Sequence, residues 1–150
     1  MPEVNCGFSD IPNGAIGQNL LVFYGPTIVV DIGFDPTFKN GIPIPGLKGI
    51  KALVDTGATE SCIDSMLATQ LNLPIVDKRT TSGCHGAQLV NMHLAQVYFP
   101  ALNFSITGAF AGVHLAAGGQ YHRALIGRTF LRHYKMSYNG KTGEVIIASP

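Results

Sequence analysis

The sequence predicts a single, mainly β domain with one or two short helices. Its 150 residues fit one domain. Its 18 glycines and 9 prolines indicate frequent turns, and several of the short apolar runs between them are rich in β-branched residues. Charged residues make up 13% of the chain, against about 25% in a typical globular domain. The apolar content of 46% excludes a disordered chain or a coiled coil.

Charge and cysteine usage limit the partners. A net charge of +1 gives no electrostatic case for a nucleic-acid partner. Cys6, Cys62 and Cys84 form no CxxC pair, so we expect reduced thiols and no zinc or other cofactor. The N-terminal residues lack the pattern of a signal peptide and no run is long enough to span a membrane, so we expect a cytoplasmic protein.

The first half of the chain is expected to hold two strands. Residues 1–26 look irregular, and residues 27–34 form a strand rich in β-branched side chains. Prolines and glycines make 35–49 a loop, and 50–54 is an apolar strand.

One helix follows, with Ser61 as its N-cap and Asp64 completing an approximate capping box. Ile63 and Leu67 lie on its apolar face, and Pro74 stops it. Further strands are expected from 75 to about 106, with a long or bent strand at 87–99, then an apolar run at 109–115. A short helix at 128–133 precedes a C-terminal hairpin, 135–138 with 144–148, whose turn begins at Asn139-Gly140.

The motif with the clearest chemistry is Asp55-Thr56-Gly57-Ala58, which follows the apolar residues 52–54. A carboxylate at the end of such a strand is costly to bury unless it is hydrogen-bonded or shares a proton. Gly57 lets the backbone turn sharply and lets a ligand approach, and the Thr56 hydroxyl can fix the turn. An Asp-Thr-Gly triplet alone is most often an ordinary turn.

Leu53-Val54-Asp55-Thr56-Gly57-Ala58 resembles the active-site signature of retropepsin-like (retroviral-type) aspartic proteases. A second segment, Leu125-Ile126-Gly127-Arg128, is similar to the family's apolar-apolar-Gly motif, which packs beside the catalytic loop. The resemblance covers about residues 27–148 and implies a closed, acid-protease-like β-barrel of one lobe. It divides the chain into an N-terminal extension of unknown role, 1–26, and a protease domain, 27–150.

The resemblance implies an aspartic endopeptidase that cleaves extended peptides with Asp55 as the catalytic group. Aspartic proteolysis needs two carboxylates that share one proton. Asp31-Ile32-Gly33 lies too close in sequence to Asp55 to be a second lobe, so Asp31 is interpreted as a strand end. The second carboxylate is therefore expected from Asp55 of another copy, in a homodimer. In the family the Thr hydroxyls join the two catalytic loops, which assigns that role to Thr56.

The family also closes a Gly-tipped hairpin, the flap, over its substrate. Gly83, Cys84, His85 and Gly86 lie where that hairpin is expected. Arg128 occupies the place of a structural arginine that pairs in viral enzymes with an acid after the catalytic triplet. Here Thr59 stands at that place, and Glu60 is the nearest alternative partner.

Three alternatives remain at this point. A non-catalytic peptide-binding or dimerisation module on the same fold would retain the same motifs. An aspartyl-phosphate enzyme would need alternating strands and helices, which the pattern does not favour. Residues 1–26 could also hold the enzyme latent by covering its groove.

Overall fold

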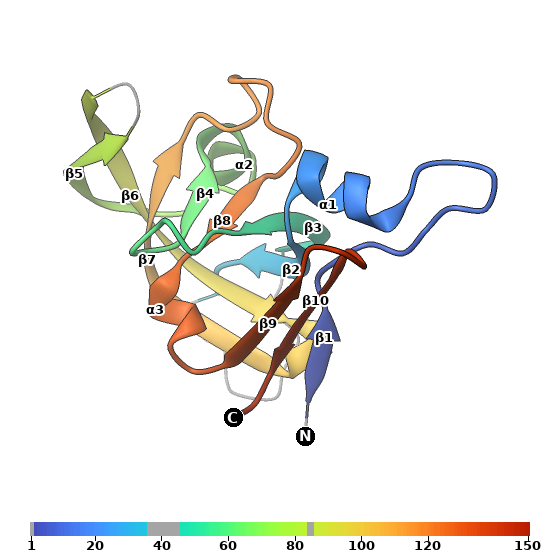
Figure 1. Cartoon of the computed structure of the whole chain (residues 1–150). Helices are drawn as coiled ribbons and strands as arrows, with labels where there is room; N and C mark the ends of the chain where they lie inside the picture. Colours follow the sequence, from blue (N-terminus) through green and yellow to red (C-terminus); the bar gives the residue numbers. More distant parts are fainter. Residues whose placement is uncertain (1, 36–45, 84–85) are drawn as a thin grey trace.

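The computed structural model describes residues 2–35, 46–83 and 86–150 (Figure 1). The strands in chain order are β1 (Glu3–Asn5), β2 (Thr27–Gly33), β3 (Gly46–Val54), β4 (Cys62–Asp64), β5 (Ile75–Gly83), β6 (Gly86–Phe99), β7 (Phe104–Val113), β8 (Ala124–Ile126), β9 (Lys135–Asn139) and β10 (Glu144–Ala148). The helices are α1 (Gly17–Tyr24), α2 (Ser65–Gln70), α3 (Arg128–Leu131) and the 3₁₀ turn η1 (Pro100–Leu102). The expected mainly β class is confirmed.

The main sheet closes into a barrel. Its strands follow the order β2-β3-β8-β4-β7-β6-β5, and an additional pairing between β2 and β6 joins the two ends of the six-stranded ring. Strand β5 extends beyond the ring as the partner of β6 in a hairpin. Most pairings are antiparallel, but β3 with β8 and β4 with β7 are parallel. The closed barrel of one lobe, which the family resemblance implied, is thus confirmed.

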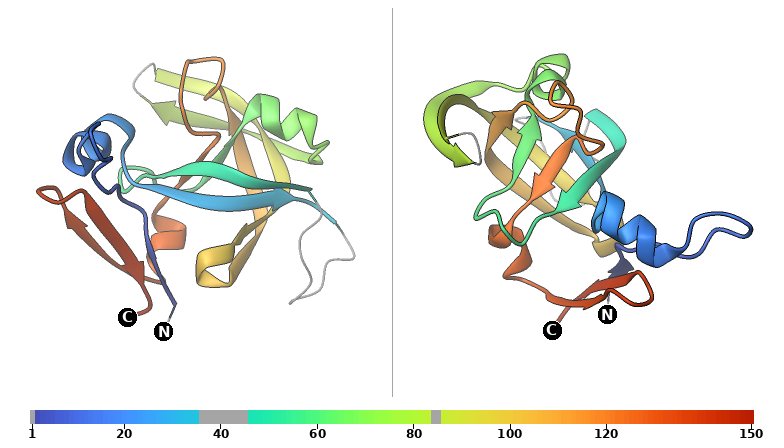
Figure 2. Two further views of the ribbon diagram at one scale, coloured as in Figure 1. Left: turned by 90° about the vertical axis from the view of Figure 1, so that its right-hand side faces the viewer. Right: turned by 45° about the horizontal axis from the view of Figure 1, so that its top comes forward.

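A second, three-stranded sheet lies beside the barrel, with the order β1-β10-β9 (Figure 2). The C-terminal hairpin forms two of its strands, as expected. The third strand, β1, comes from the N-terminal segment and pairs antiparallel with β10. The backbone pairing continues past β1, where Cys6 N donates to Val145 O over 2.7 Å.

The expectation of an irregular 1–26 was therefore wrong in two places, β1 and α1. Helix α1 has no side-chain N-cap, because Ile16 stands at that position. It ends at Gly25, whose φ of 76° is in the left-handed region. Burial of Leu21 in the core anchors the helix. Among the described residues, no helix is long and apolar enough to cross a membrane.

The core is continuous between the barrel and the second sheet. Phe99 of β6 stacks on Phe130 of α3 with ring centroids 4.3 Å apart. Val145 and Ile147 of β10 are fully buried in the same cluster as barrel residues such as Val30. Helix α3 is thus fixed between the two sheets, and with it the segment that precedes it.

Candidate active site

The two sequence motifs meet because their strands are parallel. Residues 52–54 of β3 pair in register with 124–126 of β8, so both strands end at the same edge. Asp55 N donates to Ile126 O over 2.8 Å, directly after this pairing. Asp55 and Gly127 therefore lie side by side, although the sequence separates them widely.

The Asp55 carboxylate is oriented by its own turn. Gly57 N donates to Asp55 Oδ1 over 2.9 Å, and Ala58 N donates to Asp55 O over 3.2 Å. Asp55 and Ala58 are half-buried, whereas Thr56 and Gly57 are exposed. One carboxylate oxygen is thereby fixed by a backbone amide, with the turn open to a ligand.

Residues 127–129 bind the far part of this loop. Three backbone amides donate to it: Gly127 N to Ser61 Oγ (3.0 Å), Arg128 N to Ala58 O (2.9 Å) and Thr129 N to Thr59 O (3.0 Å). A side chain at 127 would collide with the loop, because a Cβ there would lie 2.6 Å from Glu60 O. Only glycine allows this close approach of the two backbones.

Arg128 holds the loop through neutral groups. Its Nη1 donates to Thr56 O over 2.7 Å and its Nη2 to Thr59 Oγ1 over 3.1 Å. The expected pair with Glu60 is not formed in the described part of the chain, where the ion pairs are Arg79–Asp77 and Arg123–Asp64. The guanidinium therefore keeps an uncompensated charge beside the loop.

The sequence family described as gag-polyprotein putative aspartyl protease matches residues 44–133. The chain belongs to this family. The match contains both motifs and the strands between them. A search of curated proteins gave no match.

The family's threonine is free for a contact outside this chain. Thr56 is exposed, and its hydroxyl makes no hydrogen bond within residues 2–35, 46–83 and 86–150, although its carbonyl accepts from Arg128. A hydroxyl in this state is available to a second catalytic loop, the role that the family resemblance gives it.

The segment expected to form the flap falls at the turn of the β5–β6 hairpin. Gly83 and Gly86 face each other in the last pair of its ladder, and Gly86 has a φ of 88°, which favours glycine. The candidates Cys84 and His85 lie outside the described residues. The hairpin extends away from the barrel (Figure 1).

Cys62 was not recognised from the sequence as a neighbour of the site. Burial, and to a smaller extent the charge of Asp55, raises the pKa of its thiol to about 12. Cys62 begins β4 and pairs with Leu125 of the second motif. The thiol therefore stays protonated, and Cys62 is a half-buried, uncharged side chain near Asp55.

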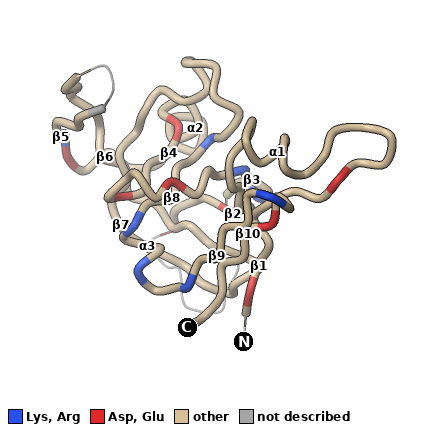
Figure 3. Tube along the Cα trace, in the orientation of Figure 1, with Lys and Arg blue, Asp and Glu red and all other residues tan. Residues whose placement is uncertain are grey.

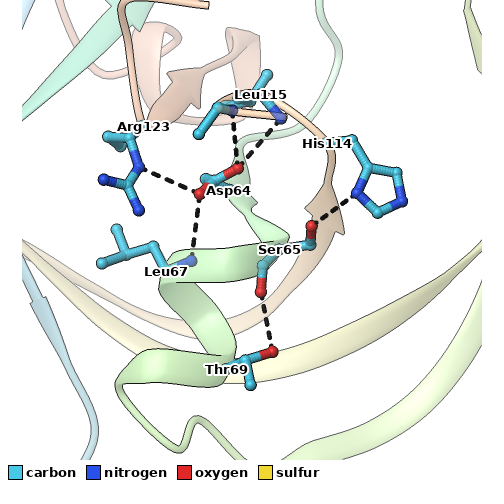
Figure 4. Close-up of polar contacts among 8 residues, drawn as sticks. Asp64, Ser65, Leu67, Thr69, His114, Leu115 and Arg123 are labelled. Carbon is cyan, nitrogen blue, oxygen red and sulfur yellow. Dashed lines mark hydrogen bonds and ion pairs between the residues drawn. The ribbon is translucent and has the colours of Figure 1, made fainter. Parts of the chain in front are cut away.

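Asp64 is the centre of a buried polar cluster (Figure 4). It is itself the N-cap of α2, accepting from Leu67 N, so the expected cap at Ser61 was wrong. It also accepts from Leu115 N (3.1 Å), Ala116 N (3.0 Å) and Arg123 Nε (3.1 Å).

These partners lower the pKa of Asp64 despite its burial, which acts in the opposite direction. The cluster joins α2 to both ends of the loop between β7 and β8. A short polar residue before a helix signals a cap, but only the folded chain brings Leu115, Ala116 and Arg123 to the same carboxylate.

No metal site is assigned. Among the described residues, no three His, Cys, Asp or Glu side chains are arranged to hold a metal ion. His122 is buried against Thr27, with its Nε2 2.7 Å from Thr27 Oγ1. Burial, followed by the charge of Lys51, lowers the pKa of His122, which favours a neutral structural ring.

Proposed function

We propose that this family member is a homodimeric aspartic endopeptidase in which Asp55 of each copy supplies one half of the catalytic pair. The observation that supports this most directly is the Asp55-Thr56-Gly57 turn, held rigidly by β8 and α3 yet exposed at Thr56 and Gly57. Family membership supports peptide hydrolysis.

The reaction needs two carboxylates in different protonation states. Like charges about 3 Å apart do not both ionise, so the pair shares one proton. The ionised member takes a proton from water, which attacks the peptide carbonyl carbon, and the protonated member donates to the carbonyl oxygen. The Gly57 amide on Asp55 Oδ1 orients the carboxyl plane for this exchange.

The other acids of the same chain are poor candidates for the second carboxylate. All 9 Asp and Glu residues fall within the described residues, and no hydrogen bond joins the Asp55 side chain to another of them there. Several are already engaged elsewhere: Asp64 by Arg123, Asp77 by Arg79, Asp31 by Gly49 N and Asp10 by Gly17 N. A second copy with its own Asp55 would supply the other carboxylate of the pair.

The substrate in this proposal is an extended peptide. It lies between the catalytic turn and the β5–β6 hairpin, where strand-like backbone hydrogen bonds give affinity. Gly57 offers a close approach on one side, and the hairpin closes on the other. The two Thr56 hydroxyls meet across the two-fold axis.

The test is a pair of matched substitutions. Asp55→Asn should lower kcat for a peptide substrate by about 10³-fold or more, with dimer affinity kept. Asp31→Asn removes a carboxylate that also follows apolar strand residues and should leave kcat unchanged. Full activity of Asp55→Asn would refute the assignment. A folded dimer of the wild-type chain that cleaves no peptide would instead support a non-catalytic binding module.

A further inference from the structure

Strand β7 has an unpaired edge. From Phe104 to Ala111, β7 pairs with β6 on one side, but on the other side β4 covers only Ala111, Gly112 and Val113. Among the described residues, no hydrogen bond joins the backbone of 104–109 to any element other than β6. The amides and carbonyls on the outer side of this edge are therefore available to a ligand.

A groove of about 550 Å³ runs along this edge. Its lining includes every residue from 104 to 110. Side chains of a strand alternate between two faces, so a consecutive run of lining residues indicates that the groove includes the strand's edge. The rest of the lining comes from Glu60 and Ser61 of the catalytic loop, from Arg79 of β5, and from Thr129, Arg132 and His133.

The edge lacks the usual features that prevent strand addition. Exposed edges are commonly protected by lysine, proline or a bulge, but residues 104–109 (FSITGA) contain no charged residue and no proline. Their pairing with β6 is regular. At Gly108 a Cβ would meet nothing within 4 Å. A glycine in a strand interior is typical of a place where another backbone comes close.

The charge beside the groove is positive. Residues 128–135 contain Arg128, Arg132 and Lys135 but no acid. The charged residues of α3 and of the turn after it are therefore all basic (Figure 3). Arg132 lines the groove without an acidic partner in the described part of the chain. Arg79 also lines it but shares its charge with Asp77, and Glu60 is the acid in the lining.

We propose that this groove binds an extended peptide with acidic side chains, which adds to the outer edge of β7 as a further strand. The backbone of residues 104–109 supplies the hydrogen bonds, and Arg132 with the α3 side selects acidic side chains. The site lies beside the cleavage site: its lining includes Glu60 and Ser61 of the catalytic loop and Arg79 of the β5–β6 hairpin, but not Asp55 or Gly57. A second copy paired through the same edge would bring two basic α3 segments together, which disfavours that occupant.

The probe is a fluorescent, end-capped peptide as long as the 104–109 edge, alternating glutamate with threonine or valine. Binding is measured by anisotropy with the full-length Asp55→Asn chain, so that cleavage does not interfere. We expect binding that weakens about tenfold in Arg132→Glu. Lys141→Glu, which makes the same charge change outside the groove, should leave the affinity within about twofold.

Two further controls separate this site from others. The same peptide with alternate amides N-methylated should not bind, because it cannot pair with the β7 backbone. A statine-type inhibitor should not displace the peptide. Failure of the peptide to bind, displacement by the inhibitor, or equal affinities for Arg132→Glu and Lys141→Glu would overturn the proposal. Binding of this peptide by the Asp55→Asn chain, together with a wild-type chain that cleaves no peptide, would refute the proposed proteolysis and leave the groove proposal standing.

Discussion

At the scale of single residues, the candidate site depends on backbone contacts more than on side-chain pairs. Asp55 is oriented by an amide of its own turn, and the turn by amides of residues 127–129. The sequence identified both motifs because their local patterns are unusual. It did not predict the partners of Arg128, because hydrogen bonds to uncharged oxygens, here Thr56 O and Thr59 Oγ1, leave no charge pattern in the sequence.

Gly127 tests this backbone contact. In Gly127→Ala the new Cβ would lie within 3 Å of Glu60 O and Ala58 O, so we expect a loss of about 1–3 kcal/mol in the free energy of unfolding. Urea unfolding measures it. Gly108→Ala is the control, because a Cβ there meets nothing within 4 Å. Equal stabilities of the two variants would argue against a tight contact at 127.

Asp64 is a stabilising residue in this account. Asp64→Ala leaves buried amides and Arg123 without their acceptor and should cost about 3 kcal/mol in unfolding free energy. Asp77→Asn, which removes an exposed pair, should cost less than about 1 kcal/mol. Similar losses in both variants would show that the cluster contributes little.

The lowered pKa of Asp64 also gives its contribution a pH dependence. A depressed folded pKa stabilises the fold above the unfolded value, 3.8, and this stabilisation is lost as pH falls through the folded pKa. The difference in unfolding free energy between wild type and Asp64→Ala should thus persist at mildly acidic pH. It should narrow only when the pH falls below 3.8.

At the scale of elements, the β5–β6 hairpin carries the flap proposal. Gly86→Ala places a Cβ at a φ of 88° and should cost about 1 kcal/mol locally. We expect a several-fold lower kcat/KM for a peptide with little change in global stability, since Gly86 is exposed. Gly49→Ala imposes the same strain at a φ of 74°, also in open space. An equal loss of kcat/KM in both variants would remove the special role of the hairpin.

Strands were predicted better than helices. The barrel strands follow from β-branched and apolar runs between turn residues, and β2 and the C-terminal hairpin lie close to their expected positions. Strand β3 ends as expected but begins at Gly46, inside the segment expected to be a loop. Helix α1 has weak local signals, because Ile16 offers no cap and its position depends on burying Leu21. Residue Ser61 resembles a cap in sequence, but in the fold it accepts from Gly127 N instead.

At the scale of the whole molecule, the N-terminal segment is part of the fold. Strand β1 covers the edge of β10, and Cys6 is buried in the core. The loop before α1 and the β5–β6 hairpin lie at opposite ends of the molecule (Figures 1 and 2). This placement argues against the alternative in which residues 1–26 cover the active site and hold the enzyme latent.

Removal of residues 1–8 should therefore destabilise the chain by several kcal/mol, because it exposes the β10 edge and opens the core at Cys6. Thermal unfolding measures the loss, and a peptide assay run in parallel should show no activation. A truncated chain that is as stable as the full chain and cleaves faster would support latency by this segment instead.

The central claim is that two copies of Asp55 form one catalytic pair, and subunit mixing tests it most directly. Wild type and Asp55→Asn are allowed to exchange at constant total concentration, and peptide cleavage is measured against the wild-type fraction. If each active pair needs both carboxylates, activity follows the square of that fraction, and an equal mixture keeps about one quarter of the wild-type rate. A linear dependence, with about one half of the rate retained, would show that one chain acts alone.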